Sequence, residues 1–304
     1  MNADLDALAT AVYVTIDDAL IADPSLAPER PSVGTAIELS DAELLTLAVL
    51  QALLGYTNEA RWIRYARGHL SELFPYIPNR PGYNKRLRNS ITMMAAMIRL
   101  LATRCDTWHD DLWLIDSTPV ECGRSRETAK RSNTAGYGGY GYCASHTRYF
   151  WGLRLHILAT PSGLPTSFAL TNAKTDEREV ARDLLDIDPA LLADRKGQTL
   201  IADKGYRSKE FETFLADLDI NFVRPATKTE TPRPDRRYLR PLRQIIESIN
   251  QTFKAQLDLE RHGGRSTTGV VARVWQRMLA LTAAIWHNQT TSQPVLRSLT
   301  AYDH

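Results

Sequence analysis

The stretch Leu112-Trp113-Leu114-Ile115-Asp116-Ser117-Thr118-Pro119-Val120 runs four apolar residues directly into an aspartate. Four consecutive apolar residues predict a strand that is buried on both faces. We expect this strand to stop at Asp116. A carboxylate at the edge of a core is costly unless a cation or hydrogen-bond donors meet it. Taken alone, the stretch favours the simpler interpretation, in which Asp116 opens a turn that contains Ser117 and Pro119.

A second stretch repeats this design farther along the chain. In Thr199-Leu200-Ile201-Ala202-Asp203-Lys204-Gly205, a short apolar strand is followed by Asp203 and a glycine turn. Carboxylate oxygens are hard ligands, so aspartates at the ends of strands are suited to Mg²⁺. The repetition favours a shared role for Asp116 and Asp203 over two unrelated turns.

A third acid, Glu247, lies on a predicted helix. Apolar residues recur there every four positions, at Ile245, Ile249, Phe253 and Leu257. At about 100° per residue, Glu247 falls off this apolar stripe and shares a face with Arg243 and Lys254. Two strand-end aspartates and a helical glutamate suit a pair of Mg²⁺ ions. Such ions, about 3.5–4 Å apart, activate an attacking oxygen and stabilise a leaving one in phosphoryl transfer.

These three blocks together resemble the DDE transposases of bacterial insertion sequences. In that family the first Asp ends the first strand, the second ends the fourth strand, and Glu lies on a later helix. Asp116, Asp203 and Glu247 fall on those positions, at spacings of 203 − 116 = 87 and 247 − 203 = 44. The family's helix reads Tyr, two residues, Arg, three residues, Glu, six residues, Lys. Arg243, Glu247 and Lys254 match it, whereas Arg240 stands at the Tyr position and Tyr238 precedes it.

The resemblance implies a fold and an activity. The fold is expected to be α/β, a ribonuclease-H-like mixed five-stranded sheet flanked by helices and preceded by an all-α N-terminal domain. The expected activity is Mg²⁺-dependent strand cleavage at the ends of an element, followed by transfer of the 3′-hydroxyl into target DNA. Asp116, Asp203 and Glu247 would be catalytic and would hold two Mg²⁺ ions, for which Mn²⁺ would substitute. Because two ends are processed together, a homodimer on DNA is expected.

Two other functions fit the same residues. A metal-dependent nuclease on this core would hydrolyse DNA without joining strands, and a non-catalytic derivative would only bind DNA. The presence of all three acids argues against the non-catalytic derivative.

Charge is segregated along the chain, although the net charge is only +2. Residues 1–56 hold nine acids and one arginine, whereas residues 57–104 hold nine Lys/Arg and two acids. Basic blocks of this kind suit a phosphate backbone, and solvated helix faces are the simpler explanation. We expect residues 1–105 to form a helical, helix-turn-helix-like domain that binds the element's terminal inverted repeats. Residues 106–291 are expected to form the catalytic domain, and residues 292–304 a tail.

Within the first domain, Ser40-Asp41-Ala42-Glu43 predicts a capping box at a helix start. A later helix is expected from Gly82 to Leu101. Its first two turns carry Lys85, Arg86 and Arg88, and its remainder is apolar. This is the arrangement of a recognition helix whose N-terminal residues meet DNA. An ordinary amphipathic helix fits equally well.

Further candidate DNA contacts lie in the second half of the chain. Residues 224–243 hold seven Lys/Arg and two acids and predict a cationic loop that leads into the Glu247 helix. Arg154 stands in a predicted second strand, at a position where the resembled family has Lys. The remaining candidates are Arg243, Lys254, Lys204, Arg236 and Arg237.

The segment Gly136-Tyr137-Gly138-Gly139-Tyr140-Gly141-Tyr142 is rich in glycine, which disfavours a helix. Its tyrosines are suited to stacking on the bases of a frayed DNA end. A mobile surface loop is the simpler interpretation. Farther on, we expect Asp176 to cap a helix that begins after Thr175.

Composition excludes several classes of protein. The N-terminus is acidic and lacks the features of a signal peptide. No uncharged apolar stretch reaches the roughly 18 residues that cross a bilayer, so no membrane association is expected. The three cysteines form no Cys-x-x-Cys pair and are interpreted as reduced thiols. We expect a cytoplasmic, nucleoid-associated protein.

Overall fold

The structure is a computed structural model that describes residues 3–30, 38–123, 126–143, 147–193, 195, 197–227, 230, 236–293 and 299. For residues 3, 4, 128, 236–240, 242 and 243 it describes the backbone only. The chain forms two compact units, Met1–Arg104 with Phe253–His304, and Cys105–Thr252. The C-terminal helix thus groups with the N-terminal helices, whereas residues 106–291 were expected to form one domain.

In its described part, the first unit is all-helical. Its helices are α1 Ala3–Ala22, η1 Pro24–Leu26, α2 Asp41–Leu53, α3 Glu59–His69, α4 Arg80–Asn89, α5 Ile91–Thr103, η6 Leu259–Arg261 and α11 Thr267–Thr290. The apolar side of α11 packs against α2 and α5. The predicted capping box is confirmed, because the Ser40 hydroxyl accepts from the Glu43 N–H at 3.0 Å and the Glu43 carboxylate accepts from the Ser40 N–H at 2.5 Å.

The helix expected from Gly82 to Leu101 is in fact two helices. Helix α4 ends at Asn89 and α5 begins at Ile91. Ser90 stands between them, and its hydroxyl donates to the Arg86 carbonyl at 2.9 Å. Such side-chain bonds to the backbone compete with the helical pattern. The cationic turns and the apolar stripe therefore belong to separate helices, and no continuous recognition helix joins them.

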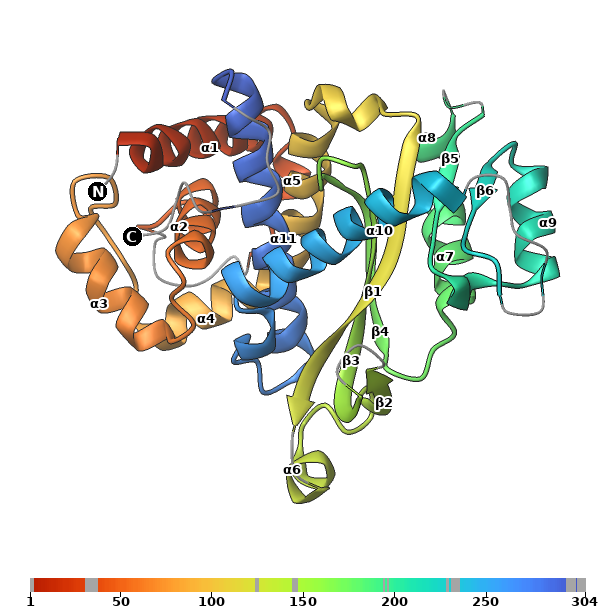
Figure 1. Ribbon diagram of the computed structural model, residues 1–304. Helices are drawn as coiled ribbons and strands as arrows, with labels where there is room; N and C mark the ends of the chain where they lie inside the picture. Colours follow the sequence, from red (N-terminus) through yellow and green to blue (C-terminus); the bar gives the residue numbers. More distant parts are fainter. Residues whose placement is uncertain are drawn as a thin grey trace. The chain divides into compact units, whose positions relative to one another are not determined.

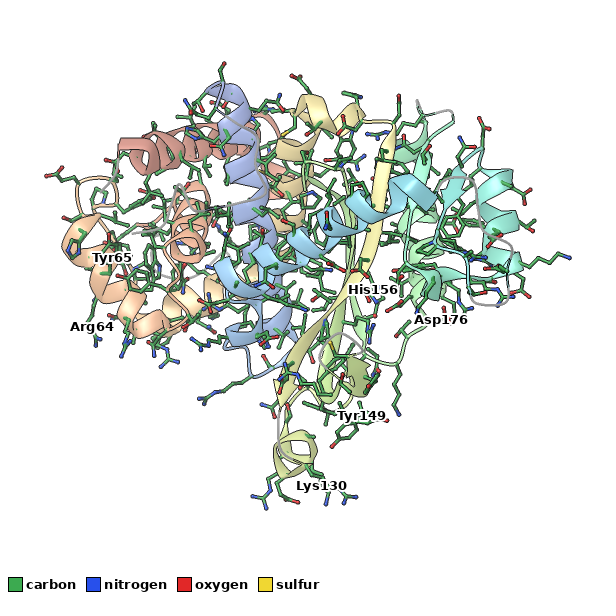
Figure 2. All side chains as sticks on the ribbon, viewed as in Figure 1. Arg64, Tyr65, Lys130, Tyr149, His156 and Asp176 are labelled. Atoms are coloured by element: carbon green, nitrogen blue, oxygen red, sulfur yellow. The ribbon has the colours of Figure 1, made fainter. Side chains whose placement is uncertain are left out.

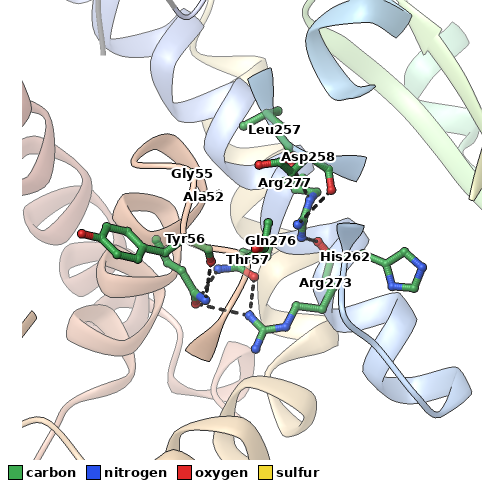
Figure 3. Close-up of a pocket in the computed structure, with 11 residues that line it drawn as sticks. Ala52, Gly55, Tyr56, Thr57, Leu257, Asp258, His262, Arg273, Gln276 and Arg277 are labelled. Atoms are coloured by element: carbon green, nitrogen blue, oxygen red, sulfur yellow. Dashed lines mark hydrogen bonds between the residues drawn. The ribbon is translucent and has the colours of Figure 1, made fainter. Parts of the chain in front are cut away.

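A buried polar network braces α11 within this unit (Figure 3). Arg273 forms an ion pair with Glu59 and donates to the Gln276 amide oxygen at 2.7 Å. Arg277 donates to the Leu257 carbonyl at 2.5 Å. Burial lowers the pKa of Arg277 to about 9. Because each guanidinium is surrounded by acceptors from its own unit, these arginines are structural residues.

The second unit contains a mixed sheet of six strands in its described part. The strands are β1 Leu112–Gly123, β2 Gly139–Cys143, β3 Arg148–Ala159, β4 Pro165–Asn172, β5 Thr199–Ile201 and β6 Asn221–Val223. The order is β4-β3-β1-β5-β6, and β2 shares with β4 the edge of β3 that faces away from β1. Strands β2, β3 and β4 pair antiparallel, whereas β1, β5 and β6 run parallel. This architecture is ribonuclease-H-like, as predicted, with one strand more than expected.

The helices of this unit flank the sheet. They are η2 Asp106–His109, α6 Arg126–Arg131, α7 Glu177–Asp186, α8 Pro189–Leu192, η4 Lys204–Tyr206, α9 Lys209–Asp217 and α10 Arg236–Gln251. Helix α10 lies across β1 (Figure 1), and α7 packs against β3 and β4. A π-helical turn, η5 Thr252–Gln256, follows α10.

Strand β1 does not stop at Asp116, which corrects the sequence-based expectation. It continues to Gly123 because β3 goes on pairing with it, with Asp116 opposite Ile157 and Val120 opposite Leu153. Only the pairing of β1 with β5 ends before Asp116, since Leu114 is the last residue of β1 that pairs with β5. Asp116 therefore lies within a strand, just past the end of its parallel neighbour.

The glycine-tyrosine segment also differs from expectation, because residues 139–143 form strand β2 instead of a loop. Gly141 lies directly opposite Phe150, and a Cβ there would come within 2.7 Å of the Phe150 ring. Glycine thus allows β2 to lie closely against β3.

Candidate active site

Asp116 and Asp203 are brought together by the parallel pairing of β1 and β5. Leu114 pairs with Ile201 in register. Asp116 stands two residues farther along β1, and Asp203 stands two residues past the end of β5. Parallel strands end at the same edge of a sheet. The two carboxylates lie close enough for the charge of Asp203 to raise the pKa of Asp116. The structure therefore unites two acids that are 203 − 116 = 87 positions apart.

The surroundings of Asp116 disfavour its negative charge. Its pKa is raised to about 7, mainly by burial and then by the charges of Glu177 and Asp203. The Ser117 backbone N–H and the Asn250 amide act in the opposite direction. Asn250 donates to the Asp116 carboxylate at 2.7 Å. A carboxylate in such a position gains most from a nearby cation.

Asp203 is half-buried and caps η4, where its carboxylate accepts from the Lys204 N–H at 2.7 Å. This contact uses one of its two oxygens. The Lys204 side chain itself is exposed beside the acid.

Glu247 stands on helix α10, the helix whose Asn250 contacts Asp116. It precedes Asn250 by three residues, and residues at this spacing are neighbours on a helix, with about 5–6 Å between their Cβ atoms. Its side chain is exposed, as expected for a residue off the apolar stripe. Among the described residues, no three His, Cys, Asp or Glu side chains are gathered as a metal site. Glu247 thus lies one helical turn from the residue that contacts Asp116, outside any such cluster.

A fourth carboxylate, Glu177, was not selected from the sequence. It opens α7 directly after Asp176, which caps the helix as predicted and whose pKa is lowered to about 2 by Arg178. Glu177 accepts a hydrogen bond of 2.6 Å from the Ser117 hydroxyl. In the sequence it is indistinguishable from an ordinary acid in the first turn of a helix.

Arg154, a predicted DNA contact, is engaged within the unit. It forms an ion pair with Glu177 and donates to the Ser117 hydroxyl at 3.1 Å and to the Tyr142 carbonyl at 3.2 Å. Only 15% of its side chain is exposed. Its charge therefore compensates Glu177 beside the Asp116 strand.

Tyr206 is a second residue that sequence reasoning missed. It is fully buried, and in the described part of the chain its hydroxyl has no hydrogen-bond partner. Burial raises its pKa well above 10, and the charges of Glu177 and Asp116 add to the effect. An unpaired buried hydroxyl is costly, so its position beside these acids indicates that a further bound group completes the site.

The residues present fit a divalent cation. Asp116, Asp203 and Glu177 are three interacting acids, against which Arg154 supplies one positive charge. Their oxygens are the hard donors that Mg²⁺ prefers. The unpaired hydroxyl of Tyr206 lies in the same neighbourhood. The oxygen donors, the excess of acids over cations and the unpaired hydroxyl therefore all suit the binding of a divalent cation.

In the first unit, the three predicted DNA contacts of α4 divide into two kinds. Lys85 and Arg88 are exposed. Arg86 instead forms an ion pair with Asp41 at 2.6 Å and donates to the Leu39 carbonyl at 2.6 Å. Lys85 and Arg88 are therefore accessible to a ligand, while Arg86 supports the fold.

The remaining DNA candidates are less completely described. The side chains of Arg236, Arg237 and Arg243 lie outside the described residues, as do positions 231–235 of the expected cationic loop. Lys254 stands in the π-helical turn, whose bonding pattern ends the α-helical spacing that relates it to Glu247.

The start of the expected cationic loop is anchored inside the second unit. Arg224 is buried and pairs with Glu212 at 2.7 Å and with Glu230 at 2.8 Å. Its charge is thus used within the fold.

Fold and site define a ribonuclease-H-like protein with a carboxylate centre at its middle strand. A protein-family model described as a transposase DDE domain matches residues 107–283, which is more than half of the chain. The chain therefore belongs to the DDE transposases, a family that generally uses divalent metals. A search of curated proteins found no match. No described helix combines the length and apolar character needed to cross a bilayer.

Proposed function

We propose that this chain cleaves DNA strands at the ends of its element and transfers the resulting 3′-hydroxyl into target DNA, with Mg²⁺ as the metal and Mn²⁺ as a substitute. The observation that carries this proposal is the pairing of Asp116 and Asp203 beside helix α10, which bears Glu247. These three acids would hold two metal ions. When bound, such ions activate the attacking oxygen and stabilise the leaving oxygen of a phosphodiester.

The chain's own side chains prepare this site. Asn250 orients the Asp116 carboxylate through its hydrogen bond. The Ser117 hydroxyl, held by Glu177 and Arg154, fixes the next residue of the strand. Lys204 is exposed beside Asp203 and would contact a DNA phosphate as a point charge.

DNA binding involves both units in this proposal. Lys85 and Arg88 of α4 would contact the terminal repeats, and Arg236, Arg237, Arg243 and Lys254 would contact DNA near the scissile phosphate. Two copies of the chain would act together on paired ends as a homodimer on DNA, in the cytoplasm at the nucleoid.

A strand-transfer assay with pre-cleaved ends tests the function. The substrate is end DNA with a free 3′-hydroxyl, supplied with Mg²⁺ and a target plasmid. We expect wild-type protein to give joined product and Asp116→Ala to bind ends without joining them. Asp217→Ala, which removes an exposed acid of α9, is the control and should join normally. Cleavage of uncut end DNA in a parallel reaction, without joining of the pre-cleaved ends, indicates a nuclease. Binding of the ends with neither cleavage nor joining indicates a non-catalytic protein.

A further inference from the structure

Three tyrosines of the second unit form an exposed cluster, which we call the tyrosine patch: Tyr140 and Tyr142 of β2 and Tyr149 of β3. Their exposed fractions are 49%, 46% and 77%, so all three rings are accessible. Tyr142 and Tyr149 are cross-strand partners with ring centroids 5.1 Å apart. Large apolar rings are seldom exposed together without a binding role.

Buried and exposed residues alternate along β2, and the tyrosine rings lie on its exposed face. Gly139 and Gly141 face the interior against Asn172 and Phe150, where a Cβ would collide with either neighbour. Because strand side chains alternate between faces, Tyr140 and Tyr142 must point the opposite way. The glycine-tyrosine pattern thus builds a closely packed strand with an aromatic outer face.

The tyrosine patch lies on the Asp116 face of the sheet. Tyr149 and Ile157 are separated by an even number of residues along β3, and Ile157 is the cross-strand partner of Asp116. On the opposite face, Arg154 donates to the Tyr142 carbonyl at 3.2 Å and to the Ser117 hydroxyl at 3.1 Å. This guanidinium therefore ties the backbone of β2 to the strand that carries Asp116.

Cationic side chains accompany the patch. Arg148 precedes Tyr149 and is 44% exposed, although it also contacts Glu121 at 3.3 Å. Lys130 and Arg131 of α6 are 63% and 84% exposed, and their contacts with Glu127 are long, at 3.6 and 3.8 Å. Figure 2 shows Tyr149 and Lys130 pointing outward at the same end of the sheet. Stackable rings beside exposed cations are the chemistry that binds single-stranded nucleic acid.

We propose that the tyrosine patch stacks on unpaired bases of a DNA strand that leads to the Asp116 site. This inference rests on the proposed function and adds a specific ligand, single-stranded DNA beside the cleavage point. Stacking is tolerant of sequence because every base has a π-face. The patch would hold a melted end without reading its bases.

The test compares single-stranded and duplex DNA on the full chain, in EDTA so that no cleavage occurs. Fluorescence anisotropy gives Kd for a labelled strand of about 12 nucleotides and for its duplex. The variants are Tyr142→Ala/Tyr149→Ala, Tyr142→Phe/Tyr149→Phe, and the control Ile187→Ala, which truncates an apolar residue that is 79% exposed in the same unit. The ratio of the two Kd values in one preparation cancels any loss of folded protein.

We expect the double alanine variant to weaken single-strand binding at least about fivefold relative to duplex binding. The phenylalanine and Ile187→Ala variants should keep the wild-type ratio. Photocrosslinking of a strand that contains 5-iodouracil should label the peptide bearing Tyr149 in the wild-type protein. An unchanged ratio in the double alanine variant, or crosslinks confined to other peptides, overturns the proposal.

Other occupants of the patch give distinct results. A change in sedimentation of the double alanine variant with an unchanged Kd ratio indicates a protein interface and overturns the proposal. If wild-type protein cleaves and joins ends while the Kd ratio of the double alanine variant stays unchanged, only the proposed role of the tyrosine patch is wrong. If wild-type protein binds neither form of DNA, both the patch and the proposed function are wrong.

Discussion

The side-chain amide of Asn250 donates a hydrogen bond of 2.7 Å to the carboxylate of Asp116, a residue 134 positions away in the sequence. This contact fixes helix α10 to the middle of strand β1. Because Glu247 lies one helical turn from Asn250, the same contact determines how near the helix-borne acid comes to the two aspartates.

Replacing Asn250 with Leu removes the donor and keeps most of the side-chain volume. We expect DNA cleavage to fall roughly tenfold to a hundredfold, since a hydrogen bond to a charged group stabilises by about 1.5–3 kcal/mol. Single-turnover cleavage rates measure the effect. Gln251→Leu, an exposed neighbour on α10, is the matched control and should cleave at the wild-type rate. Equal rates for the two variants would show that the contact with Asp116 is dispensable.

The Arg154–Glu177 ion pair should act on stability. Arg154→Met leaves Glu177 uncompensated and should lower the free energy of unfolding by about 2 kcal/mol, less than for a fully buried pair because Glu177 is 29% exposed. The double variant with Glu177→Gln should lose less than the sum of the two single variants. Urea denaturation measures both quantities.

The same variants decide between the two roles of Arg154. A direct DNA contact predicts a shallower salt dependence of DNA binding in Arg154→Met. The internal pair predicts an unchanged slope. A shallower slope with unaltered stability would contradict the structural assignment.

Most of the second unit could be predicted from the sequence because its signals are local. Apolar runs before Asp116 and Asp203 indicated two strands, and a four-residue repeat indicated the Glu247 helix. What failed depends on pairing between distant segments. Strand β1 continues past Asp116 because β3 pairs with it, and the local sequence does not show how far that pairing extends. Strand β2 forms for the same reason, against glycine's weak strand propensity.

Apolar runs draw attention to Asp116 and Asp203 in the sequence. Glu177 and Tyr206 become notable only through neighbours brought to them by folding. Arg154 was noticed for its charge, but its partner could not be known before β3 and α7 were placed together. The split between α4 and α5 falls at Ser90, where nothing in the sequence interrupts the helical pattern as a proline or glycine would.

Helix α4 offers a matched comparison of its basic residues. Lys85→Ala and Arg88→Ala should each reduce the slope of log binding constant against log salt by about 1 and change stability by less than about 0.5 kcal/mol. Arg86→Ala should instead destabilise the chain by about 2 kcal/mol, because it leaves Asp41 and the Leu39 carbonyl without this donor. Duplex binding at several salt concentrations and thermal unfolding separate the two effects. A normal unfolding temperature for Arg86→Ala would contradict this division.

His156 makes stability depend on pH. Burial lowers its pKa from 6.5 to about 4. Between these values the unfolded chain binds more protons than the folded chain, so the contribution is complete above pH 6.5 and is lost as pH falls towards 4. From pH 7 to pH 5 this group should remove about 2 kcal/mol from the free energy of unfolding.

Urea titrations of wild type and His156→Gln at both pH values isolate the contribution. The Gln variant keeps a hydrogen-bonding group for the Thr171 hydroxyl and cannot gain the proton, so its loss of stability between pH 7 and pH 5 should be smaller by that amount. Parallel losses in the two proteins would mean that His156 does not titrate as its burial implies.

The central claim is that Asp116, Asp203 and Glu247 serve one divalent-metal site. The most direct measurement is Mn²⁺ binding followed by electron paramagnetic resonance, on the free chain and on its complex with pre-cleaved end DNA. We expect Asp116→Ala, Asp203→Ala and Glu247→Ala each to weaken binding at least about tenfold, and Asp217→Ala to bind as wild type does. Wild-type Mn²⁺ affinity in Glu247→Ala or Asp203→Ala would contradict the account.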